Sequence, residues 1–462
     1  MKKHVILAGL LTFSGLAFSQ KPFTKGPLKV SENKRYLVHI DGTPFFYLGD
    51  TAWELFHRLN RADADRYLKR RAEQGFTVVQ AVALAELDGL NTPNANGDKP
   101  LIDNDPTKPN EAYFKHVDFI VDKAAEYGIV IGLLPTWGDK LNKSTWGKGP
   151  EVFNVQNART YGRWIADRYK NRPNIIWILG GDRNPRDGSQ DVAVWQAMAA
   201  GIQDGVGGAD KALISYHPQP NGMDGGASKW FAGDSWLDFN MHQNGHCRDT
   251  PMYDYITVSY NRTPTKPTMD AEPIYEDHPV CFNAKDLGTS NAYDVRKYAY
   301  LDLFAGAHGH TYGCHDIWQM YSPDKEPING PHMAWSDAVE LPAANQMKFV
   351  RRLMESRPML DRVPDQSLLV ENNTVPAERI QATRGKDYVF VYSAAGRPFT
   401  VNLGKTAGQN VKTTWMDPRT GEMNGNGTFA NRGQQKFTPP RSGYGQDWVL
   451  IIDDAAKNYP AP

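Results

Sequence analysis

Cysteine, net charge and repeated motifs are all scarce in this sequence. Only three cysteines, Cys247, Cys281 and Cys314, occur among 462 residues, far fewer than a disulfide-stapled scaffold carries. One disulfide would leave one thiol over, and the spacing does not select the pair. Basic and acidic residues number 52 each, so the formal charge is zero and gives no electrostatic basis for binding nucleic acid or an anionic membrane. No internal repeat or low-complexity tract is present.

Sequence motifs for cofactors are also missing. The chain has no phosphate-binding loop, no dinucleotide fingerprint and no serine elbow. His308, His310, Cys314 and His315 are ligand types that metals use, but their spacing matches no zinc signature and no partner elsewhere completes the set. We therefore expect neither a cofactor nor a metal. A metal-dependent hydrolase stays as an alternative, which a chelator would inactivate.

A long apolar run occurs only at the start of the chain. Lys2 and Lys3 precede the apolar stretch 5–18, and Ala17-Phe18-Ser19 has small residues at the positions that a signal peptidase reads. We expect residues 1–19 to be a signal peptide. The stretch is too short to span a bilayer comfortably, and no later stretch is long enough, so we expect no membrane-spanning segment. The sequence thus predicts a secreted or periplasmic protein, which we expect to be a monomer.

What the chain does contain is typical of a folded protein with more than one domain. Hydrophobic residues make up 40% and charged residues 23%, which allows a sizeable core. The length of 462 residues predicts two or three domains. Aromatic residues reach 11%, including 12 tryptophans and 21 tyrosines, more than such a core requires. This excess suggests a surface on which a ligand stacks.

Strand-like and helix-like segments alternate through the first two thirds of the chain. The predicted strands are 45–49, 77–83, 129–134, 175–179, 213–216, 237–241, 267–271 and 309–313. Most are followed by helical spacing, as in 62–74 and 112–127. Runs such as 130–134 are apolar on both faces, which is typical of parallel strands covered by helices. This order predicts an α/β fold, a (β/α)₈ TIM barrel over residues 20–357. A doubly wound sheet would favour a glycine-rich turn after the first strand, which is absent.

Beyond Pro358 the pattern changes to short β-type runs separated by Gly, Asn and Pro turns. The predicted strands are 367–370, 388–393, 399–403, 412–415 and 448–452. Such a series is typical of a small all-β sandwich, which we assign to residues 358–462. No cluster of acids or histidines occurs in this region. We therefore expect it to support the barrel rather than carry chemistry.

The residues at the predicted strand ends are polar or aromatic. In a barrel of this kind the chemistry sits at the C-terminal ends of the strands. The proline after His217, and the one after Glu272, hold these residues in an extended conformation at the strand end. Trp53 and Trp137 suit sugar stacking and core packing about equally. We predict that substrate is bound by Asp50, Trp53, Gln80, Trp137, Arg183, His217, His242, Gln243 and His310.

Asp182 and Glu272 are the candidate catalytic pair. Asp182 ends the fourth strand after two glycines, and Glu272 ends the seventh. These strands lie on nearly opposite sides of an eight-membered ring, so both carboxylates can point over its centre. Cleavage of a glycosidic bond requires such a pair, one acid to protonate the leaving oxygen and one carboxylate facing the anomeric carbon. We expect the two carboxyl groups to lie within about 10 Å of each other.

Simpler interpretations compete with these roles. Asp182 is also suited to capping the helix that follows the fourth strand. Asp270 rivals Glu272, since it lies two residues earlier, which places it on the same strand face one layer deeper. Glu276 and Asp277 fall in the following loop, where solvated acids are common. His217 and His242 suit hydrogen bonding better than proton transfer.

Three segments carry a family resemblance. Residues 49–56 (GDTAWELF), 180–184 (GGDRN) and 272–276 (EPIYE) resemble glycoside hydrolase family 140, the apiosidase-like (β/α)₈ enzymes. The resemblance covers roughly residues 25–455 and includes the β domain, which is similar to one described as collagen-binding. In that family the acid/base is the aspartate after strand four and the nucleophile is the glutamate after strand seven. The resemblance implies these roles for Asp182 and Glu272.

The resemblance also implies a substrate. It points to a secreted retaining hydrolase that cuts apiose–galacturonate linkages in the rhamnogalacturonan II side chains of plant pectin. An acidic substrate would suit Arg183, Arg186 or Lys140 near the barrel mouth. The alternatives are a retaining glycosidase of the same class on another pectic or arabinosyl linkage, and a non-catalytic polysaccharide-binding protein. In each case the expected partner is a polysaccharide or oligosaccharide.

Overall fold

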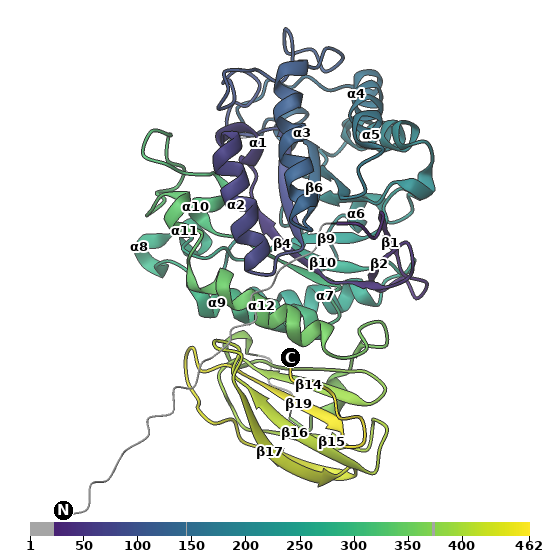
Figure 1. Cartoon of the computed structure of the whole chain (residues 1–462), viewed down its shortest axis with the longest axis vertical. Helices are drawn as coiled ribbons and strands as arrows, with labels where there is room; N and C mark the ends of the chain where they lie inside the picture. Colours follow the sequence, from purple (N-terminus) through teal and green to yellow (C-terminus); the bar gives the residue numbers. More distant parts are fainter. Residues whose placement is uncertain (1–22, 145, 372–374) are drawn as a thin grey trace, which may run out of the picture.

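A computed structural model describes residues 23–144, 146–371 and 375–462 of the chain. The predicted signal peptide, residues 1–19, lies outside these ranges. In the part of the chain described, no helix is long and apolar enough to cross a membrane. An α/β domain forms the upper part of the molecule in Figure 1, and an all-β domain lies below it.

Parallel strands form the inner wall of the α/β domain. Counted over the described residues, they are β4 (Tyr47–Thr51), β5 (Val78–Leu84), β6 (Val130–Thr136), β7 (Ile175–Gly180), β8 (Ile214–His217), β9 (Asn240–Gln243), β10 (Thr268–Glu272) and β11 (Gly309–Tyr312). Six are hydrogen-bonded in the order β11-β4-β5-β6-β7-β8, and β9 pairs with β10. The two groups of strands are joined where β8 meets β9 and where β10 meets β11. At the first junction Asp238 N–H donates to Ile214 O at 2.9 Å, and at the second His308 N–H donates to Thr268 O at 3.0 Å. The predicted barrel is confirmed, and each predicted strand lies within a few residues of its expected place.

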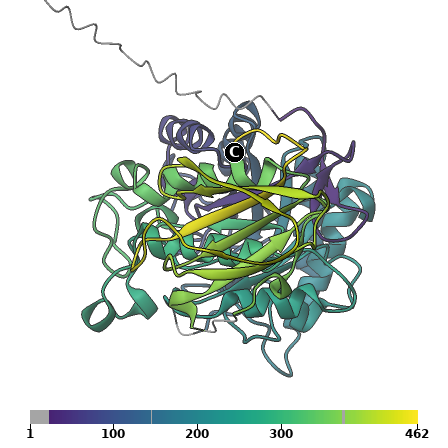
Figure 2. The ribbon, with the colours of Figure 1, turned by 90° about the horizontal axis from the view of Figure 1, so that it is seen from below.

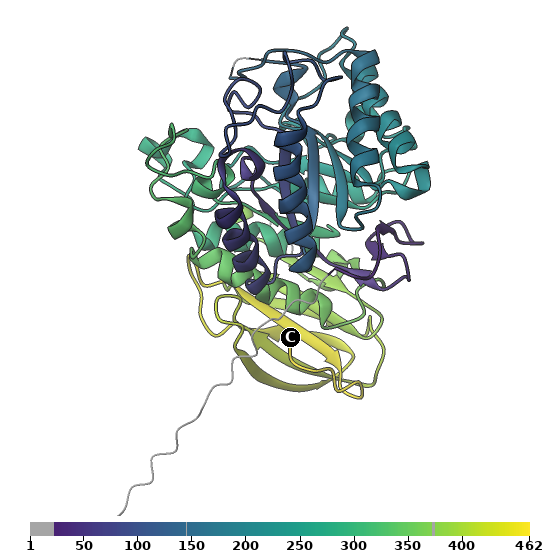
Figure 3. The ribbon, with the colours of Figure 1, turned by 45° about the horizontal axis from the view of Figure 1, so that its top comes forward.

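Helices cover the outside of this ring, and the purple and blue α2 and α3 lie in front of the strands in Figure 3. The longer ones are α2 (Arg61–Glu73), α3 (Glu111–Glu126), α4 (Val155–Tyr169), α5 (Asp191–Val206), α7 (Met252–Tyr260), α9 (Ala292–Phe304) and α12 (Pro342–Glu355). Short helical turns are α1 (Leu55–Arg58), α6 (Ser228–Phe231), α8 (Ala284–Leu287), α10 (His315–Trp318) and α11 (Trp335–Ala338). The Asn60 side chain caps α2 by accepting the N–H of Asp63 at 3.0 Å.

The helix that closes the barrel domain is separated from a short helical turn by a non-helical segment. The turn α11 ends at Ala338, and α12 begins at Pro342. A proline fits the first position of a helix and disfavours helical conformation in the residue before it.

An antiparallel meander precedes the barrel and consists of β1 (Leu28–Val30), β2 (Leu37–His39) and β3 (Pro44–Phe45).

Side chains of each barrel strand alternate between two cores. On β6, Val130 and Leu134 belong to the core along the barrel axis, whereas Ile131 and Leu133 belong to the core under the helices. This alternation follows from the two-residue period of a strand. It decides which residues near a strand end can face the cavity above the ring.

The C-terminal domain is an antiparallel β structure. One sheet contains β12 (Val363–Pro364), β13 (Ile380–Arg384), β14 (Tyr388–Ser393), β19 (Trp448–Asp454), β16 (Asn410–Met416) and β17 (Met423–Ala430), and β15 (Phe399–Leu403) pairs with β18 (Gly433–Phe437). The apolar core between them confirms the predicted all-β sandwich. The predicted strand at 367–370 is wrong, because this segment begins with the 3₁₀ turn η4 (Gln366–Leu368) and makes only an isolated bridge from Leu369 to Val401.

The β domain docks on the base of the barrel through β14 and β19, and its strands cross that base in the view from below (Figure 2). Alternate residues of β14 serve two cores, because Val389 and Val391 pack inside the sandwich while Phe390 packs against the barrel. The Tyr392 ring stacks on Tyr300 of α9 with 5.0 Å between centroids. A sheet buried on both faces ties the domain firmly to the barrel.

Candidate active site

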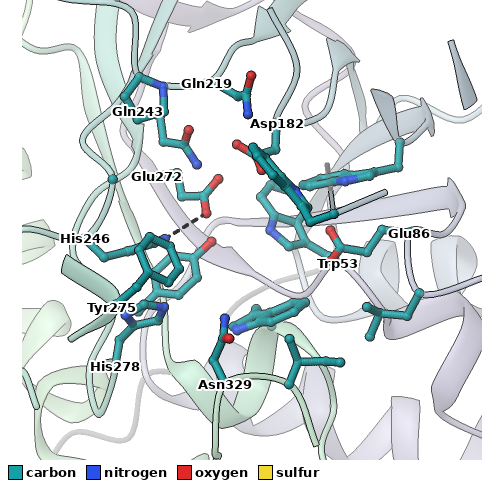
Figure 4. Close-up of a pocket in the computed structure, with 18 of the residues that line it drawn as sticks. Trp53, Glu86, Asp182, Gln219, Gln243, His246, Glu272, Tyr275, His278 and Asn329 are labelled. Atoms are coloured by element: carbon teal, nitrogen blue, oxygen red, sulfur yellow. Dashed lines mark ion pairs between the residues drawn. The ribbon is translucent and has the colours of Figure 1, made fainter. Parts of the chain in front are cut away.

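A cavity of about 500 Å³ opens at the C-terminal ends of the barrel strands (Figure 4). Segments that end or follow every one of the barrel strands contribute to its wall. No lining residue comes from the C-terminal domain, as far as the described residues go. The wall consists of Trp53, Glu86, Leu87, Trp137, Trp146, Lys148, Asp182, Gln219, Pro220, Gln243, Gly245, His246, Glu272, Tyr275, His278, Phe282, Trp318, Ile328 and Asn329.

Asp182 is placed in this wall by a tight turn after β7. Its φ of +51° is left-handed, a conformation that is uncommon for a residue with a side chain and that often occurs at functional sites. Gly180 and Gly181 are left-handed too, and a Cβ on Gly180 would lie 2.4 Å from the carbonyl oxygen of His217. The next helix, α5, does not begin until Asp191. The interpretation of Asp182 as its cap is therefore wrong.

Glu272 reaches the same cavity because β10 carries an irregularity. The pairing with β9 shifts between Asp270 and Glu272, so that Met269 and Ala271 face the barrel axis and Glu272 is turned inward as well. Asp270 instead interacts electrostatically with Asp302 of α9, in the helix layer. Our expectation that Asp270 shares the face of Glu272 is wrong for this reason.

Two imidazoles hold the Glu272 carboxylate. His217 Nε2 lies 3.1 Å from Glu272 Oε2, and His246 Nε2 lies 3.3 Å from Oε1. His217 ends β8, whereas His246 comes from the loop after β9 and has a φ of +60°. In Figure 4 the Glu272 carboxylate points across the cavity toward Asp182. Among the ion pairs of the described residues, the one that Asp182 forms is with Arg183, whose Nη1 lies 3.6 Å from Asp182 Oδ2.

The two carboxyl groups have opposite proton affinities. Burial, together with the negative charge of Glu272, raises the pKa of Asp182 to about 7. Burial alone would also raise the pKa of Glu272, but the contacts with His217 and His246 outweigh it and lower that pKa below its usual range. Near neutral pH, Glu272 is ionised while Asp182 still holds a proton in a large fraction of molecules. This is the division of states that a general acid and a carboxylate nucleophile need.

Three of the predicted substrate contacts line the cavity. The rings of Trp53 and Trp137 lie 5.2 Å apart between centroids and form one wall, while also contributing to the barrel-axis core. Gln243 lines the opposite side and hydrogen-bonds to the Asp182 carboxyl group. His217 is not in the wall itself but contacts Glu272 from the strand end.

Three other predicted contacts point away from the cavity, so the prediction is wrong for them. Each lies inside a strand on the face toward the helices. Asp50 is fully buried and paired with Arg71 of α2. His242 Nε2 lies 2.7 Å from Ser259 Oγ of α7. His310 pairs in register with Leu48, which belongs to the core under the helices.

The last two predicted contacts are buried side chains that lie outside the cavity wall. Gln80 points into the barrel, but its Nε2 donates to Ala271 O at 3.1 Å and Thr311 Oγ1 at 3.0 Å, one layer below the cavity floor. Arg183 is 1% exposed, and its guanidinium donates to backbone carbonyls of 142, 143 and 182. The guanidinium carbon Cζ lies 4.5 Å from the centroid of the Trp146 ring, and Trp146 does line the cavity. Neither residue is among those that form the wall, so both predictions are corrected to a supporting role.

The sequence argument missed several wall residues. Glu86 lies two residues after the end of β5. The rule that active-site residues lie at the C-terminal ends of barrel strands would have found it if the residues just after each strand had been included. His246, Tyr275 and His278 lie beyond the strands in loops; Tyr275 falls in the segment 272–276 that carries the family resemblance, but no local pattern marks the two histidines. The His246 ring stacks on His278 with 4.2 Å between centroids.

A disulfide that the sequence left open joins two of these loops. Cys247, next to His246, is bonded to Cys281, next to the cavity residue Phe282. The backbone N–H of Cys281 also donates to His246 O at 2.9 Å. Cys314 is buried as a free thiol. The motif around His308 and His310 does not gather into a site, and the described residues contain no group of three or more His, Cys, Asp or Glu that could hold a metal ion.

Comparisons with known proteins agree with this geometry. Residues 31–361 match the family model "Apiosidase-like, catalytic domain", and residues 363–453 match "Putative collagen-binding domain of a collagenase". A solved structure described as a glycoside hydrolase is 35% identical with a TM-score of 0.87, and the match covers 96% of this chain and 100% of that chain. A family 5 glycoside hydrolase from Bacteroides vulgatus ATCC 8482 is also 35% identical, with a TM-score of 0.87 and 96% of each chain covered.

More distant structures share the fold alone. A family 27 β-L-arabinopyranosidase from Geobacillus stearothermophilus is 10% identical with a TM-score of 0.53, and the match covers 89% of this chain and 97% of that chain. A comparison with curated proteins finds no match. The barrel, its cavity and these similarities define a glycosidase, an enzyme that hydrolyses O-glycosyl bonds of a carbohydrate substrate. Within that class, the chain belongs to the apiosidase-like family.

Proposed function

We propose that this glycosidase works by double displacement, with Glu272 as nucleophile and Asp182 as acid/base. Glu272 attacks the anomeric carbon while Asp182 gives its proton to the glycosidic oxygen, so the C–O bond breaks and the leaving sugar departs as an alcohol. Asp182, now a carboxylate, takes a proton from water. The water oxygen attacks the anomeric carbon, displaces Glu272 and releases the sugar with retained configuration.

The opposite proton affinities of the two carboxyl groups carry this proposal. Glu272 is held ionised by His217 and His246, as a nucleophile must be. Asp182 keeps its proton to an unusually high pH because it is buried beside that negative charge. The walls of Trp53 and Trp137 offer apolar ring faces of the kind on which sugars stack.

The two carboxamide variants test these roles. Glu272→Gln should fold normally and lose at least about 1,000-fold in kcat, because no nucleophile remains. Asp182→Asn should lose about 100- to 10,000-fold on a natural linkage and less on aryl glycosides with good leaving groups, which need little protonation. Proton NMR of the first sugar released would show its anomeric configuration. An active Glu272→Gln variant, or inversion of configuration, would refute the mechanism.

We further propose that the substrate is the apiose–galacturonate linkage in the side chains of rhamnogalacturonan II, as in glycoside hydrolase family 140. Membership of the apiosidase-like family supports this substrate. The basic residues that we expected near the barrel mouth do not support it. Arg186 is paired with Asp191 at 2.9 Å, and Lys140 is paired with Asp139 at 2.6 Å. Lys148 lines the cavity and is an exposed cation that an acidic sugar could approach.

Product analysis after incubation with rhamnogalacturonan II and a panel of aryl glycosides would decide the substrate. Release of apiosyl products supports the proposal. Cleavage of another pectic or arabinosyl linkage alone would replace the substrate and leave the mechanism standing. We also propose that the enzyme is exported, secreted or periplasmic, and acts as a monomer, which detection outside the cytoplasm and light scattering would test.

A further inference from the structure

Glu86 is a third carboxyl group in the cavity, and neither catalytic role uses it. It lies two residues beyond β5 in the loop above the barrel. Its backbone is fixed on both sides, because Lys140 Nζ donates to Glu86 O at 3.3 Å and the N–H of Leu87 lies 3.5 Å from Glu54 Oε1. A fixed backbone presents the side chain in one place.

The Glu86 carboxyl group itself makes no such bond. Among the hydrogen bonds and ion pairs of the described residues, none reaches its carboxyl oxygens, although the side chain is largely enclosed. It points into the cavity beside Trp53, on the side where Asp182 lies (Figure 4). Enclosed polar groups are normally hydrogen-bonded, so a group that lacks a protein partner and faces a cavity is suited to binding a ligand.

The charges around Glu86 disfavour its ionised form. Glu54 is held as an anion by His57, whose Nδ1 lies 2.7 Å from it, and Asp139 is paired with Lys140. Burial, followed by the negative charges of Glu54, of Asp182 when it is ionised, and of Asp139, raises the pKa of Glu86 well above its usual range, and the nearby Arg183 only partly opposes this. A neutral carboxylic acid can donate a hydrogen bond, which a carboxylate cannot do.

We propose that Glu86 is a substrate-binding residue whose neutral carboxyl group donates a hydrogen bond to an oxygen of the sugar held next to Asp182. The inference rests on the glycosidase function of the cavity and extends it to a third acid. Glu86 takes no part in proton transfer to the leaving group. Its contribution is to orient the sugar ring against the Trp53 wall.

Two substitutions separate this role from a charged one. Glu86→Gln keeps the size and, through its amide N–H, the ability to donate, so kcat/KM should fall less than about five-fold. Glu86→Ala removes the donor, and kcat/KM should fall about 10- to 100-fold, the usual range for a lost hydrogen bond to a ligand in an enclosed site. Glu126→Gln, on the surface at the end of α3, is the matched control and should change nothing.

The assay should be run in two forms so that this inference and the mechanism fail separately. The first is turnover of the 4-nitrophenyl glycoside that the wild type hydrolyses fastest. The second is calorimetric binding of the corresponding free sugar in a Glu272→Gln background, which does not depend on turnover. Affinity should weaken with Glu86→Ala and be largely kept with Glu86→Gln, at unchanged melting temperature.

Two results would overturn the role of Glu86. Equal losses in Glu86→Gln and Glu86→Ala would mean that a carboxylate, not a neutral donor, is required. Unchanged affinity and kcat/KM in Glu86→Ala would mean that the residue does not touch the substrate. An active Glu272→Gln variant would instead count against the proposed mechanism and leave the binding result for Glu86 intact.

Discussion

Buried charged residues have different surroundings at the cavity and at the junction between the two domains. At the junction, Arg296 of α9 donates to both carboxylate oxygens of Asp447, at 2.8 and 3.1 Å, and both side chains are buried. At the cavity, Asp182 lies beside the like charge of Glu272, and within the described ranges no residue forms a hydrogen bond or ion pair with the Glu86 carboxyl group. At the junction, the protein itself supplies the opposite charge and the hydrogen bonds. At the cavity, the acids keep hydrogen-bonding capacity that a ligand can use.

This difference separates structural from functional acids better than residue type does. Asp50 and Asp182 are both aspartates at the upper end of a barrel strand, yet Asp50 is neutralised by Arg71 and Asp182 is not neutralised to the same degree. Local arrangements that cost stability and persist are typical of functional sites. Substitutions at the two kinds of acid should therefore change different properties.

The largest effect on stability is expected at the junction. Asp447→Asn leaves Arg296 buried without its counter-ion, which should lower the free energy of unfolding by about 3–5 kcal/mol. Urea denaturation would measure this loss. The exposed pair Arg159–Asp204 gives the control, since Asp204→Asn should cost less than about 1 kcal/mol. Activity of the folded Asp447→Asn protein should be unchanged, and a loss no larger than the control would contradict a structural role.

The comparison is sharpest between Asp50 and Asp182. Asp50→Asn strands the buried Arg71 and should lower the free energy of unfolding by about 3 kcal/mol or more, with kcat/KM of the folded enzyme unchanged. Asp182→Asn should do the reverse, with impaired turnover and a melting temperature that stays the same or rises, because a buried like-charge contact is removed. Thermal denaturation and kinetics on both variants would check this. A normal melting temperature with lost activity in Asp50→Asn would restore our original assignment of that residue.

The pH dependence should follow from the opposite pKa shifts of Asp182 and Glu272, the proposed catalytic pair. Asp182 must be protonated to act as an acid, and its pKa is raised to about 7, so kcat/KM should fall above about pH 7, roughly tenfold per pH unit. Glu272 must be ionised, and its pKa is lowered, so activity should persist well below the usual range for a glutamate. The profile of kcat/KM against pH would show both limbs. An alkaline limb that survives in the residual activity of Asp182→Asn would belong to another group.

The smallest effect is expected from the disulfide that joins the two cavity loops. Cys281→Ser, or reduction, should loosen His246 from Glu272 and reduce kcat/KM by about two- to five-fold, the value of one weak hydrogen bond. The pKa of Glu272 should rise as this contact weakens, which moves the acid limb to higher pH. Reoxidation should reverse both changes in the wild type. A loss of activity with an unmoved acid limb would mean that the loops act on something other than Glu272.

Much of the barrel could be predicted from the sequence because its strands are continuous apolar runs bounded by polar turns. The strand-end rule then selected Asp182 and Glu272, which do share the cavity. It failed for Asp50, His242 and His310, since each of these residues lies before the last residue of its strand and on the face toward the helices. The first strand was predicted to end at residue 49 but continues to Thr51, and such a small boundary error changes the face on which a side chain is placed.

Sequence alone was sufficient for the order of the elements and the two acids at the ends of strands four and seven, because hydrophobic periodicity and strand ends are local properties. Tertiary structure alone decided which face each neighbouring residue occupies. The irregularity in β10 that turns Glu272 inward, the arrival of His246 from a disulfide-linked loop and the crowding of negative charge around Glu86 all depend on contacts between distant segments. Proton affinity is set by such contacts, so the chemistry of these acids follows from the folded arrangement rather than from their identity.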